Sequence, residues 1–149
     1  MSEYAFNPIQ LVEPNQNVIL DTVIPCNKGY VFHRDQSGIL ILRGIVNSNA
    51  CFARYQVTFN ANIALPEDAA AVVPVSIALA IDGEPVQTSR AIYTPAAVDE
   101  YGNVTSTAII TVPRGCCFTV AVENASPVVD GVAPAINVQN ANLTVSRIA

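Results

Sequence analysis

Charge is scarce in this sequence. Charged side chains make up 13% of its 149 residues, against about 25% in a typical globular chain. This shortage excludes a disordered tail, a coiled coil and a long charged helix, because each depends on dense charge. A monomer usually solvates its exterior with roughly 25–35% charged residues. We therefore expect other subunits to cover part of the surface.

Basic residues are scarcer than acidic ones. The chain has 7 Lys and Arg against 12 Asp and Glu, a net charge of −5, and Lys28 is its single lysine. Proteins that bind nucleic acids cluster Lys and Arg to displace counterions from phosphates. No such cluster occurs here, and anionic membranes attract the same kind of cluster. We expect neither nucleic acid nor membrane as a partner.

Signals for export and for membrane insertion are also missing. Residues 1–4 have no cationic region followed by an apolar stretch, so we expect no Sec-type signal peptide. The most apolar segment, residues 69–81, contains Pro74 and is shorter than the roughly 20 residues of a spanning helix. We therefore expect no membrane-spanning segment.

Helical periodicity is almost absent. Apolar residues alternate or form short runs, and Pro, Gly and Asn interrupt them about every 8–12 residues, which is typical of a β-sandwich or barrel. Asp82-Gly83 is the clearest hairpin turn, and residues 113–115 form another. Segments 66–71 and 95–100 begin with proline, contain acidic residues, and predict a helical turn each. The predicted strands are residues 18–24, 30–33, 39–46, 52–65, 75–81, 86–93, 104–112, 117–123 and 136–148.

Several predicted strands have one apolar face and one small, uncharged face. In residues 104–112 the second face consists of Thr105, Thr107, Ile109 and Thr111. A solvated sheet face normally carries Lys, Glu or Arg. Such faces are therefore either a smooth, threonine-rich exterior or contacts with a neighbouring subunit, because the core of an interface is depleted of charge.

The first 17 residues differ from the rest of the chain. They are rich in Asn, Gln and Pro and predict an extended arm (residues 1–17) ahead of a single domain (residues 18–149). An extended segment can add to the exposed edge of a sheet, so we expect this arm to attach the domain to a partner. Its apolar anchors are Tyr4, Phe6, Ile9 and Leu11.

The last third of the chain resembles a known family. The run TSTAIITVPRGCCFTVAVEN (residues 105–124), followed by NANLTVSRI (residues 140–148), resembles the closing strands of bacterial and phage jelly rolls of the tumour-necrosis-factor-like type. The heads of exosporium collagen-like glycoproteins and small virion proteins of phages of gut Firmicutes share this pattern. Three earlier runs agree in order: GILILRG (38–44), YQVTFNANI (55–63) and IALAIDGE (77–84).

The resemblance implies an all-β, single-domain, TNF-like jelly-roll sandwich of about ten strands. Such domains are usually homotrimers that act as display, decoration or receptor-binding heads. The chain has no Gly-X-Y stalk, which favours a free-standing trimer over the spore-coat type. We expect the trimer contact to use the final strand and its neighbour, with Phe118, Val120, Leu143 and Val145.

His33 is the only histidine. A hydrolytic triad needs a base, an orienting acid and a nucleophile. Asp35 lies two residues away on the same strand face, and no Gly-x-Ser-x-Gly motif occurs. We expect a partly buried histidine that is hydrogen-bonded near a turn, with a ligand contact or pH-sensing role at an interface as the alternative.

The four cysteines are Cys26, Cys51, Cys116 and Cys117. No C-x-x-C motif occurs, and a vicinal pair in a strand points to opposite faces, so a zinc site that also uses His33 is the weaker reading. We expect small buried thiols, with disulfides as the alternative. The acidic pairs at residues 67–68 and 99–100 lie in predicted turns without a calcium-loop motif. We expect no metal, no cofactor and no catalytic residue.

We therefore expect a non-enzymatic structural or display protein on the virion surface, where it contacts itself and a capsid or other virion protein. A phage decoration or head-fibre protein is the first hypothesis. The alternative is a lectin-like or receptor-binding head, secreted or on a bacterial surface, that recognises a host-surface glycan. Aromatic and amide side chains suit sugars, so its ligand loop would contain Asp99, Tyr101 and Asn103.

Overall fold

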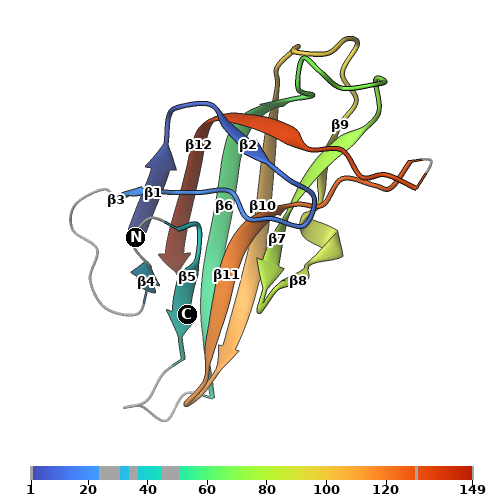
Figure 1. The fold of residues 1–149 in the computed structure, drawn as a ribbon. Coiled ribbons are helices and arrows are strands. Elements are labelled where there is room, and N and C mark those ends of the chain that lie inside the picture. The colour runs from blue at the N-terminus through green and yellow to red at the C-terminus, as the bar shows by residue number, and fades with distance from the viewer. Residues whose placement is uncertain (1, 24–30, 34–36, 45–50, 130, 149) are drawn as a thin grey trace.

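Two antiparallel sheets, each with six strands, make up the structure (Figure 1). It is a computed structural model that describes residues 2–23, 31–33, 37–44, 51–129 and 131–148. Within these ranges the only helical element is the single 3₁₀ turn η1 (Gln87–Ser89), and no helix is long or apolar enough to cross a membrane. The predicted all-β jelly roll is confirmed, whereas segments 66–71 and 95–100 are turns without helix. Helices of so few residues are marginal without tertiary packing.

The first sheet has the strand order β10-β6-β12-β1-β3, and β2 pairs with the first three residues of β12. Its long strands are antiparallel neighbours, and the pairing of β12 with β6 shifts register between Gln139 and Asn142. The bounds are β1 (Ser2–Phe6), β2 (Gln10–Val12), β3 (Thr22–Val23), β6 (Phe52–Ala64), β10 (Gly102–Pro113) and β12 (Ile136–Arg147).

The second sheet has the strand order β4-β5-β11-β7-β8, and β9 pairs with the start of β7. The turn Asp82-Gly83 between β7 and β8 is confirmed, since both residues have positive φ angles of 51° and 86°. The bounds are β4 (Val31–His33), β5 (Leu40–Arg43), β7 (Val75–Ile81), β8 (Glu84–Pro85), β9 (Ala91–Tyr93) and β11 (Cys117–Asn124).

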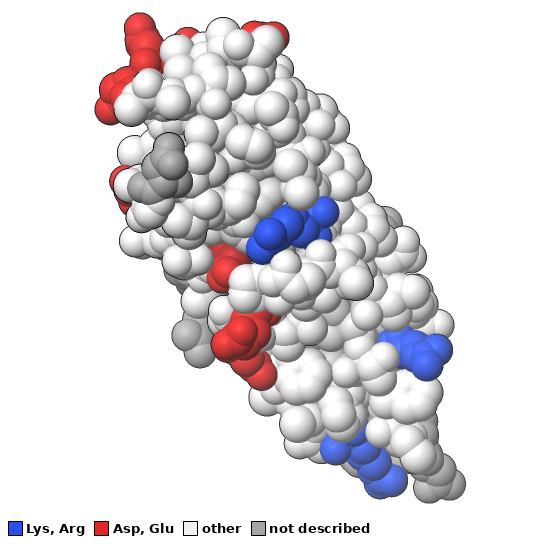
Figure 2. All heavy atoms as spheres, turned by 90° about the vertical axis from the view of Figure 1, so that its right-hand side faces the viewer, with Lys and Arg blue, Asp and Glu red and all other residues white. Residues whose placement is uncertain are grey.

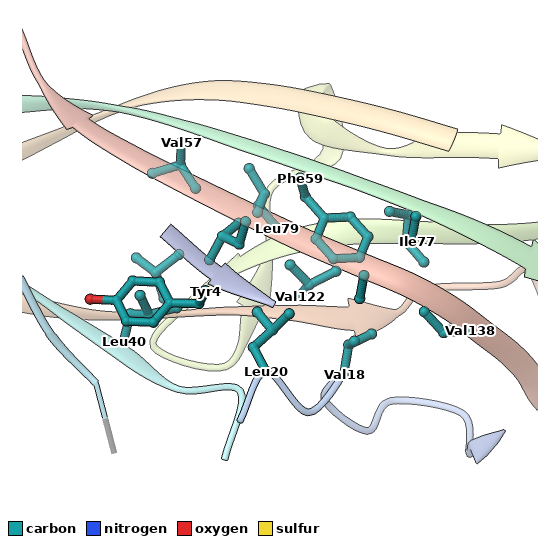
Figure 3. Packing of buried hydrophobic residues seen from close by; sticks show 14 of the residues in the cluster. Tyr4, Val18, Leu20, Leu40, Val57, Phe59, Ile77, Leu79, Val122 and Val138 are labelled. Atoms are coloured by element: carbon teal, nitrogen blue, oxygen red, sulfur yellow. The ribbon is translucent and has the colours of Figure 1, made fainter. Parts of the chain in front are cut away.

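The core lies between the two sheets and follows the alternation of the strands. Val57 and Phe59 of β6 point toward Ile77 and Leu79 of β7, and all four are fully buried (Figure 3). Val18 and Leu20, on the segment before β3, close one side of this cluster. Complete burial of such a side chain contributes about 1.5–3 kcal/mol, so the cluster is the main source of stability.

The N-terminal segment belongs to the sandwich, and the prediction of a separate arm over residues 1–17 is wrong for its first part. Strand β1 lies between β12 and β3, with Tyr4 opposite Leu143. The Tyr4 side chain is 0% exposed and stacks on His33, with ring centroids 4.9 Å apart. Phe6 is half-buried, whereas Ile9 and Leu11 remain 56% exposed. The apolar anchors therefore divide into core residues and surface residues.

Candidate functional surface

The outer face of the first sheet is polar and almost free of charge. It is formed by alternate residues of β6, β10 and β12, which point away from the core. We call this surface the amide–hydroxyl face. Its residues are Gln56, Thr58, Asn60, Asn62, Asn103, Thr105, Thr107, Ile109, Thr111, Asn137, Gln139, Asn142, Thr144 and Ser146.

Hydrogen bonds between side chains tie this face together across the strands. Asn103 Nδ2 donates to Oδ1 of Asn60 at 2.8 Å and to Oδ1 of Asn62 at 3.2 Å. Thr105 Oγ1 donates to the same Asn60 oxygen at 3.2 Å, and the hydroxyls of Thr58 and Thr107 are 3.2 Å apart. Burial of a polar group costs less free energy when the group already has a hydrogen-bond partner in the protein. The face can therefore be covered by a partner without many lost hydrogen bonds.

The structure places Asp99, Tyr101 and Asn103 at one end of this face but does not bring them together as one site. Asp99 is exposed in a turn, with a φ angle of 58°. Tyr101 is half-buried, and this burial is the main reason why the pKa of its hydroxyl is raised. The charge of Asp99 raises the pKa further, and a hydrogen bond with Asn137 lowers it. The Asn103 amide is engaged with the asparagines of β6.

The predicted trimer residues lie elsewhere. Val120, Leu143 and Val145 are at most 1% exposed inside a single chain, and Phe118 is half-buried against the same core. The side chains of Val120, Leu143 and Val145 fill the sandwich, so they have no surface to offer a second copy. The prediction is wrong for these three residues, because they are on the apolar face of each strand, which the two sheets of one chain bury between them. Phe118 keeps part of its side chain exposed, and its contact with a second copy stays a prediction.

His33 is held as a structural residue. Its Nε2 atom lies 2.8 Å from the carbonyl oxygen of Ser37, and its ring packs on Tyr4. The Nδ1 atom is buried and has no hydrogen-bond partner among the described residues. The prediction of a partly buried histidine, hydrogen-bonded near a turn, is confirmed. Asp35 lies outside the described residues.

The cysteines overturn the expectation of buried thiols. Cys51, Cys116 and Cys117 are all free and exposed, and Cys26 lies outside the described residues. Cys51 is bonded through its carbonyl to the Arg114 amide, so all three thiols lie near the β10–β11 turn. In the described part of the chain no group of three His, Cys, Asp or Glu side chains could hold a metal ion. The turn exposes these cysteines because it extends beyond the end of the core.

Charge is separated along the length of the sandwich. Four arginines lie at or near the tip that carries the β10–β11 turn. We call this tip the arginine end, and its residues are Arg43, Arg54, Arg114 and Arg147. The loops at the opposite tip form the acidic end: Glu67, Asp68, Asp99 and Glu100. Figure 2 shows acidic side chains at the upper tip and basic ones toward the lower tip, with further acidic and basic side chains between the two tips.

Comparison with known proteins identifies the fold. No family model and no curated protein sequence matches the chain. The globular domain of zebrafish complement 1qA protein is similar, with a TM-score of 0.63 and 13% identity over 99% of this chain and 96% of that one. The Eiger TNF of S. frugiperda has a TM-score of 0.66 and 10% identity over 99% of this chain and 92% of that one.

Murine APRIL at pH 5.0 is a more distant match, with a TM-score of 0.50 and 12% identity over 93% of this chain and 98% of that chain. At such low identities the similarity establishes the fold and nothing beyond it. The chain has the jelly-roll fold of TNF and C1q domains, as the sequence resemblance implied.

Proposed function

We propose that this chain is a non-enzymatic structural or display protein that forms a homotrimer on the exterior of a phage particle, as a capsid decoration or head-fibre protein. The observation that carries the proposal is the amide–hydroxyl face. None of the residues that define it is ionisable; Arg54 continues the row on β6 at one end, Glu3 accepts a hydrogen bond from Asn142 at one edge, and Ile109 on the face is 61% exposed. The cores of subunit interfaces are depleted of charge in this way. The jelly-roll resemblance also implies self-association through a trimer.

The oligomeric state is tested by light scattering after gel filtration, with and without reductant. We expect a mass near three times 15.8 kDa. Thr107→Arg places an unpaired charge on the face and should lower the mass to that of a monomer. Gln16→Arg adds the same charge at an exposed site on the segment that pairs with β11, and should leave the trimer intact.

A monomeric wild type over the whole accessible concentration range would exclude the trimer. Equal masses for Thr107→Arg and the wild type would show that copies associate through another surface. Loss of the trimer in reductant alone would instead assign the assembly to the exposed cysteines.

The particle contact is proposed to use Ile9, just before β2, and Leu11, within β2, since both are 56% exposed at the acidic end of the sheet. Immunogold labelling of phage particles and cells from the source culture tests this placement. Label on capsids supports the decoration role, and label confined to cell surfaces contradicts it. The double variant Ile9→Asp/Leu11→Asp should no longer bind particles while keeping its oligomeric mass.

A glycan-binding head is the second candidate, and one observation favours it. The amides of Asn60, Asn62 and Asn103 gather at one end of the amide–hydroxyl face, and Tyr101 is hydrogen-bonded to Asn137 of the same face. Aromatic and amide side chains of this kind suit sugar hydroxyls. A glycan array decides the question: specific binding that Asn103→Ala removes would support this role, and no binding would exclude it.

A further inference from the structure

A groove of about 420 Å³ lies at the acidic end of the sandwich. One wall is the loop that follows β6, with Leu65, Ala69 and Val73. The other wall is the segment before β12, with Val132 and Pro134. Sites for small molecules typically have volumes of about 300–1,000 Å³ and are mostly apolar. The size and lining of this groove agree with both criteria.

Hydrogen bonds hold both walls in place. In the first wall the Ala69 amide donates to the Pro66 carbonyl at 3.0 Å, and the Asp99 amide donates to the Leu65 carbonyl at 2.9 Å. In the second wall Val129 and Val132 exchange two backbone hydrogen bonds of 2.9 and 3.1 Å. The walls are therefore ordered before any ligand arrives, which lowers the entropy cost of binding.

Exposed apolar side chains occur on the segments that form both walls. Val129 and Val132 line the groove and are 37% and 69% exposed. Val72 and Val128, each next to a lining residue in the chain, are 46% and 67% exposed. Single apolar side chains are common on protein surfaces, but exposed ones that line a hollow indicate a binding site. Contact between these side chains and water is unfavourable, and an apolar ligand in the groove would remove part of it.

The charge around the groove has one sign. Asp68 is the only ionisable residue among the described residues that line it, and Glu67, Asp99 and Glu100 belong to the same end of the molecule. Four of the described arginines lie at the opposite end of the sandwich. A hollow with low-dielectric walls and carboxylates at its rim concentrates cations and repels anions.

We propose that this groove binds a small apolar amine, with its hydrocarbon or aromatic part between the two walls and its ammonium group beside the Asp68 carboxylate. The walls supply the affinity through burial of apolar surface. Asp68 supplies the selectivity, because a charge-assisted hydrogen bond favours an ammonium group over a neutral or anionic one. The site is separate from the amide–hydroxyl face and does not depend on trimer formation.

Three indole probes of different charge test this proposal: tryptamine, a cation; indole-3-propionate, an anion on the same two-carbon chain; and 3-methylindole, which is neutral and has one carbon in place of that chain. The chain has no tryptophan, so indole fluorescence and anisotropy report bound probe without background from the protein. We expect tryptamine to bind at least about tenfold more tightly than indole-3-propionate, with 3-methylindole between them. Tryptamine binding no tighter than that of indole-3-propionate would overturn the proposal.

Matched variants assign the binding to this groove. Asp68→Asn should remove the preference for tryptamine over 3-methylindole, whereas Glu67→Gln, next to it but outside the lining, should keep the preference. Ala70→Phe adds bulk to an exposed lining position and should abolish binding of all three probes without a change in the melting temperature. Unchanged binding by Ala70→Phe would place the probes elsewhere and overturn the proposal.

A second copy of the chain is the competing occupant. Val132→Glu, at an exposed lining position, distinguishes the two by light scattering. An unchanged oligomeric mass supports an open groove that takes a small ligand. A lower mass would make the groove a subunit contact, and the amine site would be rejected.

Discussion

Glu123 is unusual because it is an acidic residue in a nearly buried position. Its side chain lies on β11 opposite Ala78 and is only 5% exposed. Burial, and to a smaller extent the charge of Glu84, raise the pKa of its carboxyl above the ordinary value of 4.5. The folded chain therefore binds this proton more tightly than the unfolded chain. Its stability falls as the pH rises from the ordinary pKa through the raised one, and the loss is complete above it.

We predict that Glu123→Gln stabilises the protein at neutral pH, because the amide cannot ionise in its buried site. Below the ordinary pKa the two proteins should have the same stability, since Glu123 is then neutral in both the folded and the unfolded chain. Melting temperatures between pH 3 and 8 measure this difference. Glu84→Gln, at an exposed position, is the control and should give a smaller gain. A variant that is less stable than wild type at neutral pH would contradict the prediction.

Strand β1 is the element whose role differs most from the prediction based on sequence. Because Tyr4 is fully buried, Tyr4→Ala should lower the free energy of unfolding by about 3–5 kcal/mol, the range for a large aromatic core residue. Leu11→Ala, from the same predicted arm but 56% exposed, should change it by less than about 0.5 kcal/mol. Urea denaturation measures both, and equal effects would mean that β1 does not belong to the cooperative unit.

The long strands could be predicted from the sequence because their alternation is regular over many residues. Strand β1 could not, since its partner β12 lies at the other end of the chain and Pro8 interrupts the pattern after five strand residues. The prediction of one strand over residues 86–93 is wrong for its first half. There the Ser89 hydroxyl donates to the Val86 carbonyl at 2.6 Å and accepts from the Leu79 amide, which favours the turn η1.

The candidate site could be predicted in part. The small, uncharged face that contains Thr105 and Thr107 followed from the alternation, and both residues are exposed as that interpretation requires. Val120 and Leu143 were predicted to contact a second copy, but both are buried inside one chain. The alternation shows that one face of each strand is apolar, but it does not show whether the other sheet of the same chain or a second copy covers that face. The groove escaped prediction because its walls, near Ala69 and Val132, are far apart in the chain.

For the whole molecule, the three exposed thiols lead to a prediction about chemistry in solution. Cys51, Cys116 and Cys117 should react with Ellman's reagent in the native protein, without denaturant, because none of them is covered. Wild-type protein should yield at least three fast equivalents per chain, and the triple serine variant should lack them. Reaction only after unfolding would show that an assembly of several copies covers this tip.

The acidic loops at one tip and the arginines at the other give the molecule an electric dipole along its strands. Strand β12 alone is 12 residues long, or about 40 Å at roughly 3.3 Å per residue, with acidic loops beyond one end and arginines at the other. If copies assemble around an axis along the strands, their dipoles add instead of cancelling. The particle then has two chemically distinct poles and adsorbs to a positively charged support with its acidic tip down, so that the tip with arginine and thiol groups faces outward.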